Sequence, residues 1–262
     1  MADGGSGGSG GRMLVVVAHP DDETFGCGSV LAHAASRGVE TVVGCATRGE
    51  AGSDAADIAA IRERELRDAA TVLGVRRVEL LGWIDSGMDG EPAPGTLVAA
   101  PLDEVARAVA ALVDDVRPDV VVTLDASDGH RDHAHVRDAT LLAVDHATWH
   151  TPRVYLQCLP QRLMRRWVRE LRAKQPDSDH LALGDLGTPD ELVTTILDTA
   201  EHLALRERAI AIHASQTSPY EVMADDLRRE FLATDRLRRV RPEWSGGPLE
   251  TELFGPEQHA PA

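Results

Sequence analysis

Cysteine is scarce in this chain of 262 residues, which has only Cys27, Cys45 and Cys158. An odd number of cysteines at wide spacing does not fit a disulfide framework. Unpaired thiols are typical of proteins kept in a reducing compartment. We therefore predict a cytoplasmic protein.

Positive charge is also in deficit, because 27 Lys and Arg residues face 43 Asp and Glu residues and the formal net charge is −16. A surface of that charge repels phosphate groups, which disfavours nucleic acid or an anionic membrane as the main partner. A small, neutral or cationic substrate fits the composition better. The sequence does not decide whether the protein forms a homo-oligomer.

Long apolar segments are missing as well. No run approaches the roughly 20 apolar residues that a membrane-spanning helix needs, and no signal peptide is recognisable. Residues 1–12 are mostly glycine and serine, so we expect a flexible linker there. Residues 13–262 are expected to form a single domain, since hydrophobic residues make up 43% of the chain and suffice for a core.

Short apolar runs alternate with helical patterns through the first two thirds of the chain. The expected strands cover 13–18, 39–46, 77–81, 119–124 and 153–159, and the expected helices cover 29–37, 54–73, 101–116 and 136–149. This alternation predicts an α/β fold with a Rossmann-like, doubly wound, mostly parallel sheet. Beyond residue 160 we expect a helix to about 174, a long helix over 189–213 and a tail, together forming a helical or irregular lobe on the sheet.

One group of reactive side chains follows the first expected strand. The valine-rich run over 13–18 leads into His-Pro-Asp-Asp-Glu at 19–23, where a proline ends the strand. Ligands bind outside the carboxyl ends of such strands. His19 and Asp22 could hold a divalent ion, with Asp21 as a base beside it. An aspartate-rich turn that caps the next helix explains the same residues, and the stretch alone does not decide between the two.

A second group follows the valine-rich strand over 119–124 and contains His130 and His133. A histidine pair near a helix start is more often solvated or structural than a metal site. If the two strand ends are neighbours, however, His133 completes a zinc site with His19 and Asp22, because catalytic zinc takes three protein ligands of these types. His135 is the alternative third ligand.

These motifs carry a resemblance to a known family. Ala18-His-Pro-Asp-Asp-Glu23, followed by Gly129-His-Arg-Asp-His133, resembles the LmbE/PIG-L family of zinc-dependent N-deacetylases. The similarity covers most of residues 13–220 and includes four further segments: Thr47–Glu50, Arg62 with Glu65, Asp85–Met88 and His213–Gln216. It implies a Rossmann-like sheet and hydrolysis of an N-acyl group, usually acetyl, from an amino sugar or glycoconjugate.

Carried over by position, the resemblance assigns the metal ligands to His19, Asp22 and His133. The metal is expected to be Zn²⁺, with another divalent cation possible. Asp21 matches the general base that takes a proton from the attacking water. His130 matches the histidine that stabilises the tetrahedral intermediate.

The resemblance also gives roles to residues around these. Asp132 would orient the intermediate-stabilising histidine. Arg62 and Asp85 match positions that contact sugar hydroxyls in family members of the mycothiol pathway. Two residues depart from the family pattern, because Arg131 replaces a usual proline and Arg206 replaces a common lysine. Arg131 at the mouth of the site could alter substrate selectivity.

Two other functions remain as alternatives. The same residues would serve an amidase that cleaves thiol conjugates of the mycothiol type. A noncatalytic, metal-containing Rossmann-like binding module is disfavoured by Asp21, because a binding protein needs no base there. A nucleotide-binding protein is disfavoured too, since no Gly-x-Gly-x-x-Gly turn follows the first strand.

Overall fold

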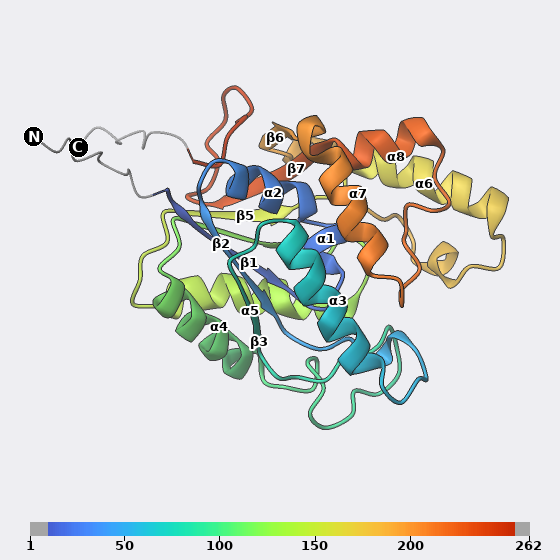
Figure 1. Cartoon of the computed structure of the whole chain (residues 1–262), viewed down its shortest axis with the longest axis horizontal. Helices are drawn as coiled ribbons and strands as arrows, with labels where there is room; N and C mark the ends of the chain where they lie inside the picture. The colour runs from blue at the N-terminus through green and yellow to red at the C-terminus, as the bar shows by residue number, and fades with distance from the viewer. Residues whose placement is uncertain (1–9, 255–262) are drawn as a thin grey trace, which may run out of the picture.

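The computed structural model describes residues 10–254, without the side chains of residues 179 and 180. Its centre is a seven-stranded sheet in the order β3-β2-β1-β4-β5-β7-β6 (Figure 1). The first five strands in this order are parallel, and β7 is antiparallel to both of its neighbours. The predicted mostly parallel α/β sheet is thus confirmed. The strands are β1 (Arg12–Val17), β2 (Glu40–Cys45), β3 (Arg77–Leu80), β4 (Val120–Leu124), β5 (Arg153–Gln157), β6 (Thr195–Asp198) and β7 (Thr234–Arg241).

Helices cover both faces of the sheet. One layer contains α2 (Gly28–Ser36), α3 (Ile58–Val72) and α7 (Leu203–Ile212), and the other contains α4 (Leu102–Val116) and α5 (Arg131–His146) (Figure 1). Successive side chains of β1 point into opposite layers, with Val15 in the first cluster and Val16 in the second. A strand buried on both sides has no polar face, which explains its continuous apolar sequence.

The C-terminal third adds a separate apolar cluster beside the sheet. Trp167 of α6 (Gln161–Lys174) and Phe231 of α8 (Asp225–Leu232) belong to it, together with Tyr220. The remaining elements are short: α1 (Asp22–Phe25) and the 3₁₀ turns η1 (Glu50–Gly52), η2 (Asp179–Ala182), η3 (Asp190–Leu192) and η4 (Ala200–His202).

The predicted long helix over 189–213 is wrong. The segment contains η3, then the strand β6, then η4 and the ten-residue helix α7. Residues 195–198 form a strand because they pair with β7, which lies some 40 residues further along and was predicted only as part of a tail. Pairing at that separation leaves no local periodicity, so the alanine- and leucine-rich surroundings favoured a helix.

Two smaller differences concern element boundaries. The predicted linker falls largely on residues 1–9, outside the described part of the chain, and β1 already begins at Arg12, whose N–H donates to the Asp119 carboxylate at 2.7 Å. The helix expected from 136 begins at Arg131.

Cys27, Cys45 and Cys158 are buried and unpaired.

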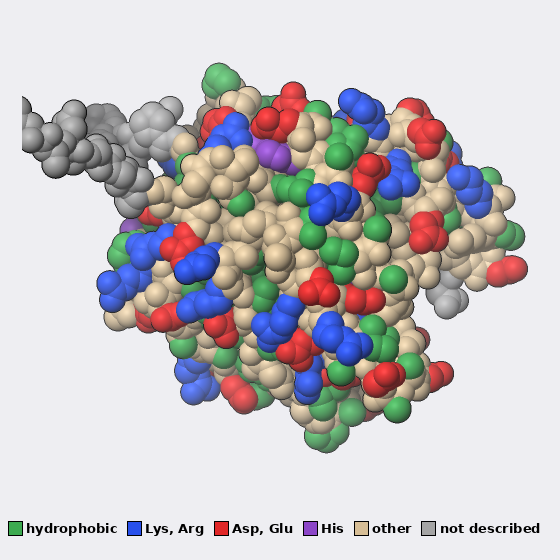
Figure 2. Space-filling view, viewed as in Figure 1, with side chains coloured by type: hydrophobic (Ala, Val, Ile, Leu, Met, Phe, Trp, Pro, Cys, Tyr) green, Lys and Arg blue, Asp and Glu red, His purple; other side chains and the backbone are tan. Residues whose placement is uncertain are grey.

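On the face drawn in Figure 2, acidic and basic side chains are interspersed, and no large patch is of one sign. Within residues 10–254, no helix is both long and apolar enough to cross a membrane.

The strand order places the reactive segments together. The chain winds outward in both directions from β1, whose neighbours are β2 on one side and β4 on the other. A crevice opens at the carboxyl ends of the strands where the order reverses in this way. Residues 19–23 follow β1 and residues 125–133 follow β4, so both groups border that crevice.

Candidate active site

Four donor atoms of three residues from the two segments lie close together. His133 Nε2 lies 3.3 Å from His19 Nδ1 and 3.2 Å from Asp22 Oδ1, and His19 Nδ1 lies 3.4 Å from Asp22 Oδ2. Zinc bonds of about 2.0–2.1 Å at tetrahedral angles separate two ligand atoms by about 3.3 Å. The spacing is therefore compatible with one divalent ion held by the three predicted ligands.

The tautomers of both histidines suit metal binding. His133 Nδ1 donates to the Asp128 carboxylate at 2.6 Å, and His19 Nε2 donates to the Asp132 carboxylate at 3.0 Å. In each ring the other nitrogen faces Asp22 and can bind a metal ion once it has lost its proton. Carboxylates placed behind metal-binding histidines in this way orient the rings and make them better ligands.

Electrostatics at this point favour positive charge. Burial by itself would lower the pKa of both histidines, but Asp132 and Asp22 hold the pKa of His19 well above its usual value. Asp22 and Asp128 outweigh burial at His133 and raise its pKa to about 10. Side chains that stabilise protons so strongly also stabilise a divalent cation.

Asp128 had no assigned role in the sequence. It lies five residues before His133 in the loop that leads into α5, and one carboxylate oxygen contacts the His133 ring. Its other oxygen accepts the backbone N–H of His130 at 3.1 Å. Burial raises the pKa of Asp128, but His133 outweighs this effect and the net pKa is lowered. The sequence did contain a signal for this role, because Asp128 is a carboxylate close to both histidines in the chain.

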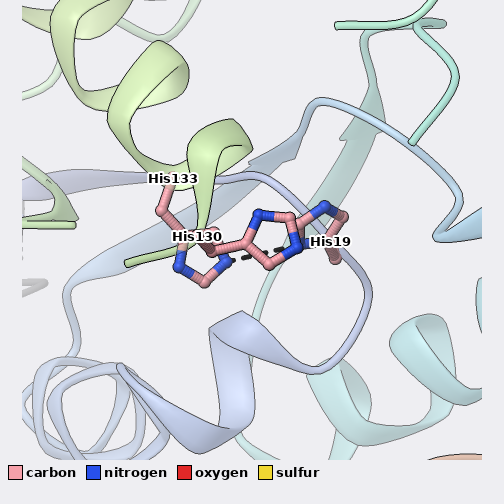
Figure 3. A group of neighbouring side chains, drawn as sticks. All are labelled: His19, His130 and His133. Atoms are coloured by element: carbon pink, nitrogen blue, oxygen red, sulfur yellow. Dashed lines mark hydrogen bonds between the residues drawn. The ribbon is translucent and has the colours of Figure 1, made fainter. Parts of the chain in front are cut away.

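His130 lies beside the donor set, with its ring stacked on that of His133 at 4.7 Å between centroids (Figure 3). Its Nδ1 accepts the backbone N–H of Asp132 at 3.2 Å and so caps α5. Burial, with His19 and His133 nearby, lowers the pKa of His130 to about 4. His130 is therefore a neutral ring whose proton sits on Nε2.

The resemblance predicted that Asp132 orients His130. In the structure the Asp132 carboxylate does not do so. The carboxylate instead binds His19 and accepts the backbone N–H of Ser86 at 3.0 Å. Only the backbone of Asp132 contacts His130. Asp132 is fully buried, and its carboxylate links His19 to the loop over 82–101.

Asp21, the predicted base, adopts an unusual backbone conformation. Its φ of 118° lies in a region that residues other than glycine rarely adopt. Arg62 donates to the Asp21 carboxylate at 3.1 Å. Burial and the adjacent Asp22 raise the pKa of Asp21 to about 7, although Arg62 opposes the shift. That pKa lies in the range where a carboxylate can accept and return a proton at neutral pH.

The two predicted substrate contacts lie within the same network. Arg62 is only 4% exposed, and it also donates to the backbone oxygens of Pro20 and Gly49 at 2.6 and 2.9 Å. Asp85 Oδ1 lies 3.4 Å from His19 Nε2. Burial would raise the pKa of Asp85, but its contacts with His19 lower it well below the usual range.

The two residues that depart from the family pattern both donate to backbone carbonyl oxygens. Arg131 donates to the carbonyl oxygens of Ser86, Gly87 and Gly90, so its guanidinium holds the loop over 82–101. Arg206 is 2% exposed and pairs with Asp235 at 3.2 Å.

Other histidines do not join the site. In the described chain, the donor atoms of His130 converge with those of His19 and His133, whereas His135 belongs to no such group. His33, Glu201 and His202 form a separate group beside a cavity of about 920 Å³. The guanidinium of Arg37 donates to His33 Nδ1 at 2.8 Å and lies 4.0 Å from Glu201, so a cation is already present there.

Known proteins resemble this chain in sequence and in structure. The family model described as "PIG-L: GlcNAc-PI de-N-acetylase" matches residues 14–144. A 1D-myo-inositol 2-acetamido-2-deoxy-alpha-D-glucopyranoside deacetylase of Geodermatophilus obscurus is 33% identical over 284 residues, covering 93% of this chain and 97% of that protein.

Two solved structures show how widely the fold is used. The N,N'-diacetylchitobiose deacetylase of Pyrococcus horikoshii aligns with a TM-score of 0.55 at 19% identity, over 87% of this chain and 83% of that one. A 4-carboxy-2-hydroxymuconate hydratase of Pseudomonas putida KT2440 aligns with a TM-score of 0.60 at 21% identity, over 90% and 99%. The fold therefore hosts more than one reaction, and the site must decide which one applies. Because the family model matches residues 14–144 and a relative is 33% identical over 93% of the chain, the chain belongs to the PIG-L family.

Proposed function

We propose that this protein is a zinc-dependent N-deacetylase that hydrolyses the acetamide of an amino sugar in a small glycoconjugate. The observation that carries the proposal is the convergence of His19, Asp22 and His133, with Asp21 directly preceding one of the ligands. Two imidazoles and one carboxylate suit zinc better than magnesium or calcium, which prefer oxygen ligands alone.

When bound, the metal ion supplies a Lewis acid that acidifies water and polarises the amide carbonyl. Asp21 accepts a proton from the attacking water and later returns it to the departing amine. Its pKa of about 7 supports both steps. Arg62 donates to the Asp21 carboxylate at 3.1 Å and so restricts its orientation.

His130 is assigned the role of donor to the oxyanion that forms on the substrate carbonyl. As a neutral ring with its proton on Nε2, it can donate one hydrogen bond. A preorganised donor of this kind is worth about 3 to 4 kcal/mol in other hydrolases. Asp132 and Asp128 would keep the metal-binding rings in their productive tautomers.

For the substrate, we propose a neutral N-acetylglucosaminide of an inositol or similar polyol. The relative from Geodermatophilus obscurus carries such a substrate in its name, and this chain covers 97% of it. The net charge of −16 suits a substrate without phosphate. Asp85 at the edge of the site can accept a sugar hydroxyl, and the buried, unpaired cysteines support the cytoplasm as the compartment.

The test is mass spectrometry of N-acetylated compounds after incubation with zinc-loaded protein. The panel contains N-acetylglucosaminyl inositol, a simple N-acetylglucosaminide, and the amide of a thiol conjugate. We expect loss of acetyl from the first compound and none with zinc-loaded Asp21→Asn, because losing a general base costs about 10² to 10⁴ in rate. Cleavage of the thiol conjugate alone would favour the amidase, and wild-type protein inactive on every amide would refute the proposal.

A further inference from the structure

Glu23 and His213 form a buried pair directly behind the predicted base. Glu23 is fully buried and His213 is 1% exposed. His213 Nε2 lies 2.8 Å from Glu23 Oε1, to which the Thr24 hydroxyl also donates at 2.5 Å. A carboxylate without solvent is costly unless such partners satisfy it.

The second oxygen of Glu23 points to the base. Glu23 Oε2 accepts the backbone N–H of Asp21 at 2.9 Å. Asp21 has a φ of 118°, and a side chain in that region persists only when its surroundings hold it there. Glu23 thus holds the Asp21 peptide group, while Arg62 holds the Asp21 carboxylate.

His213 reaches this point from a distant part of the chain. It follows α7, 190 residues beyond Glu23, and the ring of Phe25 packs edge-on against it at 5.8 Å. In the described structure its hydrogen-bond partners are Glu23 and Thr24, and the three metal donors are not among them. His213 is therefore joined to the site through the Glu23 segment that carries Asp21.

We propose that Glu23 and His213 are positioning residues that fix the backbone of Asp21 and so direct the base at the reacting water. The inference rests on the proposed deacetylase function. His213 fixes the Glu23 carboxylate, and Glu23 fixes the Asp21 peptide in a conformation that the chain would otherwise leave.

A double-mutant cycle tests this order of action. We expect His213→Leu to lower kcat by about 10- to 100-fold at near-normal zinc content and KM, because small displacements of catalytic groups cost rates of this size. His213→Gln keeps an N–H donor and should stay within about 3-fold of wild type. In the Asp21→Asn background, His213→Leu should cost less than about 3-fold more, since residues that act as a unit are not additive.

A buried hydroxyl elsewhere provides the control for general destabilisation. Thr195 is fully buried in β6 and donates to Glu250 at 2.8 Å. Thr195→Val should lower the melting temperature while leaving kcat unchanged. If His213→Leu does not fold, His213→Asn takes its place, because its amide is too short to reach Glu23. A full loss of kcat on top of Asp21→Asn would overturn the proposal.

A measurement without substrate separates this inference from the proposed function. In protein labelled with ¹⁵N-aspartate, the Asp21 amide is identified by its disappearance in Asp21→Asn. We expect that resonance to move in His213→Leu and to stay in place in Thr195→Val. An unchanged Asp21 resonance in His213→Leu would refute the positioning role, whereas failure of wild-type protein on every amide would refute only the deacetylase function.

Discussion

The side chain of Asp21 suits catalysis, but its backbone conformation disfavours any side chain. A carboxylate at this position can act as a base, but the φ of 118° would suit glycine better than any residue with a side chain. Strain of this kind costs about 1–3 kcal/mol and is found at functional sites. The strained backbone of Asp21 is therefore expected to lower the free energy of unfolding while it orients the carboxylate.

Two substitutions at this position isolate the strain. Asp21→Gly and Asp21→Ala both lose the contact with Arg62, but only glycine adopts the observed φ freely. We expect Asp21→Gly to be more stable than Asp21→Ala by about 1 kcal/mol or more. Urea denaturation of the zinc-loaded variants gives the difference. Equal stability of the two would mean that position 21 is not strained.

Arg62 is expected to act through the base more than through the substrate. The sequence suggested that it binds sugar hydroxyls, which predicts a rise in KM on substitution. Its guanidinium is instead buried and bound to Asp21, Pro20 and Gly49. Arg62→Met should therefore lower kcat at least 10-fold, as the loss of a positioned group does, with a smaller change in KM. Steady-state kinetics on a verified substrate would refute this if only KM rose.

At the scale of elements, the four-residue helix α1 depends on the C-terminal third. Arg206 of α7 donates to the carbonyl oxygens of Thr24, Phe25 and Gly26, where α1 ends. A guanidinium at that end satisfies free carbonyls and complements the helix dipole. Tyr220 also donates to Phe25 O at 2.5 Å. A helix this short has little stability of its own, so these contacts fix the segment that carries Asp22.

Removing the Arg206 side chain should destabilise the protein strongly. Arg206→Met leaves Asp235, 3% exposed, without its charged partner, and breaking a buried pair costs about 3–5 kcal/mol. Arg206→Met with Asp235→Leu should recover part of this loss. Arg208→Met, on the exposed face of the same helix, should change the free energy of unfolding by less than about 0.5 kcal/mol. Equal effects at 206 and 208 would contradict the role of the buried pair.

At the scale of the whole molecule, a bound ion should couple two distant segments of the sequence. Residues 19–22 follow β1, whereas residue 133 lies in α5, and the two segments meet only in the folded chain. An ion that binds the native state and not the unfolded chain stabilises the native state, by about 4 kcal/mol at a thousand-fold excess over Kd. The surplus of carboxylates around the donors also means that the ion relieves repulsion among them.

We therefore expect chelation to lower the melting temperature and zinc to restore it. His133→Ala should lose both the bound metal and this shift, because it removes one of three converging donors. His135→Ala is the matched control, since His135 lies two residues further along the same helix and outside the donor group. Elemental analysis and thermal unfolding measure both effects. Full metal content in His133→Ala with loss in His135→Ala would reverse the ligand assignment.

The sequence alone determined the parallel part of the sheet and the position of the candidate site. Valine-rich runs of strand length reveal buried strands without knowledge of their partners, and β1 and β4 were both recognised in this way. Reactive side chains at the ends of such strands must lie at one edge of a parallel sheet. That rule brought His19, Asp22 and His133 together before any distance was known.

Only the tertiary structure decided which side chains support them. The bonds from Glu23 to His213 and from Arg62 to Asp21 join residues 190 and 41 positions apart, and the carboxylate of Asp132 turned out to hold His19 and not His130. The strands β6 and β7 were missed for the same reason, since each exists through its pairing with the other. Local periodicity records burial along one segment, whereas hydrogen-bond partners and strand pairing depend on where the rest of the chain folds.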